Sequence, residues 1–176
     1  MKHPFIFTFL CILVWGCQSH EVNTKEISNK AHQQANKMAE FIVKRNADSL
    51  ISLNYPRLIQ LSGGKDKIIE YMRKIWKKYD DDGVKILSIQ VDNPPKMVYY
   101  HGLYQCTISQ TMVMQKGDKK VEVKSAMIGL STDNGNKWYF LDVTSQKLSN
   151  IKATLPEISN ELEIPESKAT LLKNSN

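Results

Sequence analysis

Residues 97–115 read MVYYHGLYQCTISQTMVMQ, and this stretch decides the fold. From Tyr104 onward, mostly apolar side chains take one phase of a two-residue period, while Gln, Ser and Thr take the other. That alternation is typical of an antiparallel strand with one covered face. A Lys-Gly-Asp-Lys turn at 116–119 then reverses the chain. The sequence therefore predicts one long strand over 97–115 that pairs with the segment after the turn.

Two changes of phase predict that the strands are irregular. Within 84–91, Val84 and Ile86 share one phase and the later apolar residues take the opposite one, so we expect a bulge near Ile86-Leu87. Within 121–130 the phase also changes, and we predict a second bulge near Lys124-Ser125. Bulged strands of this length curve, so the sheet should be curved.

The last predicted strand, 138–143, is apolar on both faces, so another segment or a partner should cover its outer side. The residues before it, 131–138, read STDNGNKW and resemble the Asp-box of sialidases, with Lys137 in place of Thr. The resemblance implies a hairpin held by Asp133 with Trp138 beneath it. Because the motif occurs once in a chain too short for a propeller, we assign it to folding.

Helices precede the strands. Apolar residues at helical spacing predict a helix over 26–45, and a second, clearer amphipathic helix covers 65–80. A short helix is expected over 49–53, between them, and another over 146–154. Gly83 should end the second long helix in a left-handed conformation.

Helices followed by consecutive antiparallel strands indicate an α+β fold, with N-terminal helices packed on a curved sheet of about four strands. This order of elements, over about Glu26 to Thr144, resembles the nuclear-transport-factor-2-like superfamily, which includes ketosteroid isomerase. The resemblance implies a cone-like domain in which the helices close over the concave sheet and leave a pocket.

Candidate pocket residues are those that the cone would turn inward. They are Tyr55, Trp76, Tyr100, Tyr104, Gln110, Met112 and Met114. Asp142 is the one candidate for a catalytic base, because it shares a strand phase with Trp138 and Phe140. A hydrogen bond from nearby backbone at the end of the strand is the alternative role of Asp142, and we favour it. We predict no metal site and no cofactor, because His20, His32 and His101 are scattered along the chain.

The N-terminal residues predict export. Lys2 precedes a short uncharged apolar run, 5–16, which is the pattern of a signal peptide and is too short to span a bilayer. Val14-Trp15-Gly16-Cys17 resembles the lipobox of bacterial lipoproteins, although Trp15 departs from the small residue usual at its position. The resemblance implies cleavage before Cys17 and lipid on Cys17, which would anchor the protein to a membrane. By the same resemblance, Gln18 after Cys17, in place of Asp, implies release from the inner membrane, so we expect the outer membrane or the cell surface of a bacterium.

These signals predict four regions: a signal peptide (1–16), a lipidated tether (17–25), an α+β domain (26–155) and a partly disordered C-terminal tail (156–176). Ile158, Leu162 and Ile164 could dock, and 167–176 should be frayed. With Cys11 removed and Cys17 acylated, Cys106 stands alone, and we interpret it as a small buried apolar residue.

Composition limits the function. The net charge of +6 falls to +5 once Lys2 is removed with the signal, and the lysines are scattered rather than set in a basic stripe with aromatics, so we expect no nucleic-acid partner. The leading hypothesis is a non-catalytic envelope lipoprotein that binds a small apolar ligand or an envelope protein. The alternatives are an isomerase-like or dehydratase-like enzyme using Asp142, or a purely structural interaction module.

The lipobox generates a direct test. Protein extracted from membranes should begin at Cys17 and carry the extra mass of its acyl chains, as measured by intact-protein mass spectrometry. An unmodified chain that still begins at Met1 would refute the anchoring hypothesis.

Overall fold

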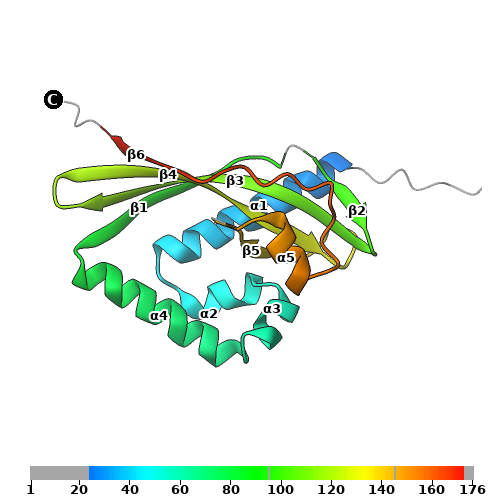
Figure 1. Cartoon of the computed structure of the whole chain (residues 1–176), viewed down its shortest axis with the longest axis horizontal. Helices are drawn as coiled ribbons and strands as arrows, with labels where there is room; N and C mark the ends of the chain where they lie inside the picture. Colours follow the sequence, from blue (N-terminus) through cyan, green and yellow to red (C-terminus); the bar gives the residue numbers. More distant parts are fainter. Residues whose placement is uncertain (1–23, 95, 145, 173–176) are drawn as a thin grey trace, which may run out of the picture.

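The computed structural model describes residues 24–94, 96–144 and 146–172. Within them the chain is α+β: helices pack on a strongly curled antiparallel sheet that forms a half-barrel (Figure 1). The predicted signal peptide, Cys17 and most of the predicted tether lie outside the described residues. Inside the described ranges no helix is long and apolar enough to cross a membrane.

The predicted helical segments are confirmed, with shifted ends. Helix α1 (Thr24–Val43) buries the small side chains Ala31 and Ala35 completely, which allows close packing on the sheet. Asn46 caps α2 (Ala47–Leu50) by accepting from the Ser49 N–H, and a 3-10 turn, η1 (Ile51–Leu53), continues α2. The next two helices are α3 (Pro56–Leu61) and α4 (Lys65–Asp81). Gly83 follows α4 with a φ of +66°, as predicted.

The centre of the sheet is a long hairpin of β3 (Leu103–Lys116) and β4 (Lys119–Ser131). Shorter strands flank it. On one side β1 (Val84–Val91) and β2 (Val98–Tyr100) share the edge of β3; on the other side β5 (Tyr139–Asp142) and β6 (Lys168–Leu172) share the edge of β4. The sheet is therefore four strands wide along the path β1-β3-β4-β5.

The register confirms one predicted bulge and contradicts the other. Pairing of β1 with β3 shifts between Ile86 and Ser88, so Leu87 is the extra residue, and the shift brings Ile86 and Ile89 onto the same face. Pairing of β3 with β4 runs without a shift through Thr111↔Lys124, so the second bulge was wrong. The apolar phase of β4 changes there because the strand is buried on both faces from Ser125 onward.

The strand predicted over 97–115 is in fact a hairpin. Tyr100 pairs with Leu103, and the two residues between them, His101 and Gly102, have φ values of +49° and +78°. Positive φ at both central residues is what a type I′ hairpin turn requires, and glycine supplies the second one without a steric cost.

Two buried clusters lie on opposite faces of the central hairpin. Residues of α1, α2 and Trp76 of α4 cover the concave face, around Cys106, Ile108 and Met127. On the convex face Ala126, Ile128 and Leu130 are covered by α5 (Leu148–Thr154) and by the segment after it. The predicted cover for the outer face of the last strand is thus a segment of the chain itself.

The covering segment continues as a C-terminal strap, residues 155–172, which runs along the sheet to β6 (Figure 1). Ile158 and Leu162 are buried, as the docking hypothesis expected. Lys168–Leu172, expected to be frayed, pairs with β4 instead. The fully buried amide of Gln105 holds the strap: its Nε2 donates to the Glu157 carbonyl at 2.8 Å and its Oε1 accepts from the Ser159 N–H at 2.9 Å.

The predicted Asp-box hairpin is also confirmed. Asp133 Oδ1 accepts from the Lys137 N–H at 2.8 Å and from the Ser131 hydroxyl at 2.9 Å, and the Trp138 indole donates to the Gly135 carbonyl. Desolvation raises the pKa of Asp133, but the hydrogen bonds outweigh it and hold that pKa below its ordinary value. Trp138 is fully buried beneath the turn, so the motif serves folding.

Replacing the strap's buried anchor should destabilise the domain. Gln105→Leu would leave the Glu157 carbonyl and the Ser159 N–H buried without a partner, at a cost of about 2–4 kcal/mol in the free energy of unfolding. The loss in the free energy of unfolding is measured by urea denaturation monitored with circular dichroism. The control is Gln90→Leu at an exposed site of β1, which should change stability by less than about 0.5 kcal/mol. Equal midpoints for the two variants would contradict the role given to Gln105.

Candidate functional site

The sequence-predicted pocket residues do not meet in one cavity. Tyr55 and Tyr100 belong to the convex cluster, whereas Trp76 and Tyr104 belong to the concave one. Tyr100 and Tyr104 share a sequence phase, but the β2–β3 turn between them places them on opposite faces of the sheet. Tyr55 precedes α3 and Trp76 lies on α4, so strand phase says nothing about either residue.

Each aromatic candidate has a structural role. Burial, together with a hydrogen bond from its hydroxyl to Glu157, raises the pKa of Tyr55 to about 12. Tyr100 stacks on His101 with ring centroids 4.0 Å apart, and Tyr104 packs against Tyr99 at 4.9 Å. Trp76 is the one buried residue of α4.

Gln110 and Met112 lie on the concave face, toward the hairpin end. Gln110 is buried and its Nε2 donates to the Ser125 hydroxyl at 3.2 Å, while its Oε1 has no partner among the described residues. Met112 and Met114 are half-buried and belong to neither cluster. None of the three residues lines the main cavity described below.

Asp142 takes the alternative role that the sequence suggested. The residue is exposed at the end of β5, and its carboxylate oxygen Oδ1 accepts from the Thr144 N–H at 2.7 Å. A carboxylate in this position caps a turn; it does not occupy the water-poor pocket that an isomerase-type base needs.

A cavity does lie between the helices and the sheet, and we call it the main cavity because of that central position. Its volume is about 290 Å³. It is not the largest hollow, since one of about 510 Å³ lies at the surface between residues 146–148 and 164–167. Every helix from α1 to α4 contributes an apolar side chain to the main cavity, and β5 closes the far wall. The apolar lining residues are Met38, Leu50, Leu58, Ile68, Met72, Ile75, Phe140 and Leu141. Asn54, Ser62, Tyr71 and Asp142 supply the polar atoms.

Apart from Asp142, the lining residues of the main cavity are not singled out by the sequence, and the apolar ones of α4 stand out only as part of an apolar helix stripe. In the structure Ile68, Met72 and Ile75 of that stripe are all half-buried. What the sequence could not give is the angle at which α4 meets β5, and that angle decides whether a stripe fills the core or lines a hollow.

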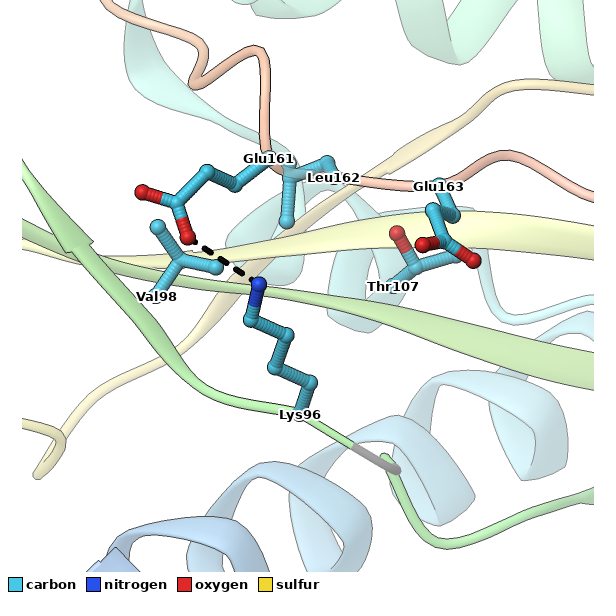
Figure 2. Close-up of a pocket in the computed structure, with 6 residues that line it drawn as sticks. All are labelled: Lys96, Val98, Thr107, Glu161, Leu162 and Glu163. Atoms are coloured by element: carbon cyan, nitrogen blue, oxygen red, sulfur yellow. Dashed lines mark hydrogen bonds and ion pairs between the residues drawn. The ribbon is translucent and has the colours of Figure 1, made fainter.

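A smaller pocket of about 240 Å³ lies where the strap crosses β2 and β3 (Figure 2). Val98 and Leu162 form its apolar wall, and the Lys96 ammonium approaches the Glu161 carboxylate to 3.0 Å across it. Figure 2 also shows Glu163 beside Thr107, whose buried hydroxyl has no partner among the described residues. Both side chains of the ion pair are more than half exposed, so the pair adds little stability.

The described residues offer little for acid–base or metal chemistry. His32, on α1, forms a hydrogen bond with the Val91 carbonyl, and His101 lies in the β2–β3 turn. In residues 24–94, 96–144 and 146–172 no three His, Cys, Asp or Glu side chains gather closely enough to hold a metal ion.

Comparison of the chain with protein-family models, with curated proteins and with solved structures gave no match. The resemblance to the nuclear-transport-factor-2-like superfamily and the resemblance of 14–17 to a lipobox therefore stay predictions. The function has to be argued from the geometry of the site.

Cys106 should be chemically inert in the folded state. Burial raises the pKa of its thiol to about 12, although a hydrogen bond involving Gly129 opposes the shift. At pH 8 only about one molecule in ten thousand would then carry the reactive thiolate. In a variant with Cys11 and Cys17 replaced by Ser, Ellman's reagent should detect no thiol in the native protein and one thiol after unfolding in guanidinium. Rapid native labelling would contradict this interpretation.

Proposed function

We propose that this protein is a non-catalytic binding protein whose main cavity takes a small apolar ligand. The observation that carries the proposal is the apolar lining of that cavity, built by four helices and β5. Its volume of about 290 Å³ lies near the lower end of ligand sites, which are roughly 300–1,000 Å³. Such sites are mostly apolar with a few polar groups, as here.

The enzyme alternative has less support. Its one acid candidate, Asp142, is exposed and engaged with Thr144, and the histidines lie elsewhere. The one described thiol, Cys106, is buried. An acid–base mechanism would need a second titratable group in the cavity wall. Among the described lining residues this group is Tyr71, whose side chain is exposed rather than held in a water-poor site.

The proposed location is a bacterial envelope, with the domain held at a membrane by lipid on Cys17. Its support is the apolar run and the lipobox-like 14–17 in the sequence. A membrane-anchored binding domain could meet apolar ligands that leave or enter the bilayer.

A second candidate function, binding of an envelope protein, is favoured by one observation. Two rows of directly opposed side chains cross the projecting end of the sheet from β1 to β6. The rows are Ile86–Met114–Val121–Leu171 and Ile89–Met112–Val123–Ala169. All eight residues are apolar: Ala169 and Leu171 are exposed, the other six are half-buried, and Ile89 also packs against the concave cluster. Apolar faces that stay partly exposed in this way often mark interaction sites.

Filling the main cavity should abolish ligand binding. Ile75→Trp places a large ring in the cavity from a half-buried site on α4. The fluorescent apolar probe N-phenyl-1-naphthylamine should then bind at least about tenfold more weakly, a change of ~1.4 kcal/mol, because the apolar area that it would bury is lost.

The matched control is Ile86→Trp, a half-buried isoleucine in the apolar rows of the projecting sheet end. It should leave probe affinity within about twofold, an effect of ~0.4 kcal/mol. Thermal melts of both variants show whether each folds. The reverse result, in which Ile86→Trp blocks the probe and Ile75→Trp does not, would move the binding site to the sheet end.

A further inference from the structure

Asp142 lies at the junction of two hollows. One is the main cavity, and the other is a side hollow of about 150 Å³ between β5 and α5. The two hollows share three lining residues: Leu58, Leu141 and Asp142. A molecule too long for one hollow could therefore extend past Asp142 into the other.

The charge at this junction is of one sign. Among the described residues that line either hollow, Asp142 is the one with a charged side chain, and neither lining includes a lysine or an arginine. The protein carries a net charge of +6, so a hollow whose one charged side chain is negative has the opposite sign of charge to the protein as a whole. A negative group beside an apolar surface attracts a positive one and repels a carboxylate.

The carboxylate of Asp142 is held in place. Asp142 ends β5 in register with Met127, and its Oδ1 accepts from both the Thr144 N–H, at 2.7 Å, and the Thr144 hydroxyl. A carboxylate has about four acceptor positions on its two oxygens, so these two bonds leave the other oxygen, Oδ2, for a ligand. The neighbouring residue Leu141 faces both hollows, which places apolar surface next to the charge.

We propose that the ligand is a cationic amphiphile, such as an alkyl amine, whose charged end lies against Asp142 and whose apolar part lies in the main cavity. This inference rests on the proposed function, since it names the class of ligand for the same cavity. It gives Asp142 a binding role in place of the catalytic one.

The size of the effect follows from the exposure of Asp142. Ion pairs at exposed sites are weak, so the charge should favour the amine by about fivefold over a neutral ligand of equal length. The preference should shrink at high salt, because added ions screen exposed charges.

The test compares three probes of equal chain length, decylammonium, decanol and decanoate, each competing with N-phenyl-1-naphthylamine for the full-length protein. The expected order of affinity is decylammonium, then decanol, then decanoate. In Asp142→Asn, which keeps an oxygen acceptor for Thr144, decylammonium and decanol should bind within about twofold of each other while decanol affinity is unchanged. The control is Asp118→Asn in the exposed β3–β4 turn, which should keep the preference.

The outcomes separate the two proposals. If all three probes bind equally well and Ile75→Trp weakens them all, the cavity binds ligands and the cationic class is wrong. A preference for decylammonium that survives in Asp142→Asn also overturns the inference. If no probe binds, or if Ile75→Trp has no effect on any of them, the proposed function fails and the inference fails with it.

Discussion

The pairing of β3 with β4 supports every other part of the described chain, because both faces of this hairpin are covered. The helices lie on one face and the strap lies on the other, so each layer depends on the same backbone hydrogen bonds. Gly129 is a point of close approach in this hairpin. A Cβ atom there would lie 3.1 Å from the Cys106 sulfur, 3.2 Å from the Trp138 ring and 3.3 Å from the Phe140 ring, so the absence of a side chain lets the two aromatic rings pack over the strand.

The sequence was informative wherever local chemistry decides structure. The two-residue period with one phase change located the bulge at Leu87, and the turn residues of 131–138 located the Asp133 hairpin. The sequence was misleading where a distant segment determines which residues are buried. In β4 the apolar phase changes because both faces become buried, and this looked like a change of register. Strand β6 was missed because its pairing with β4, rather than its own composition, makes it a strand.

The candidate site shows the same division. Asp142 was recognised from its strand phase, and its capping role was one of the two that the sequence allowed. The α4 wall of the main cavity was recognised as an apolar stripe but not as a wall, since a hollow arises from the angle between α4 and β5. The aromatic candidates were assigned to one pocket because the predicted cone would turn them inward, whereas the structure divides them between clusters on the two faces of the sheet. The proposed ligand binding therefore rests on the tertiary arrangement, while the predicted export rests on residues 1–17 alone.

The C-terminal strap also has a consequence for how the protein is made. Residues 155–172 leave the ribosome after β4, and at about 5–20 residues per second this delay lasts a few seconds. During that interval Ala126, Ile128 and Leu130 have no cover, and the edge of β4 that β6 will occupy is open. A sheet that pairs before the strap docks would therefore expose an apolar face and an open strand edge, which are the two features that favour aggregation.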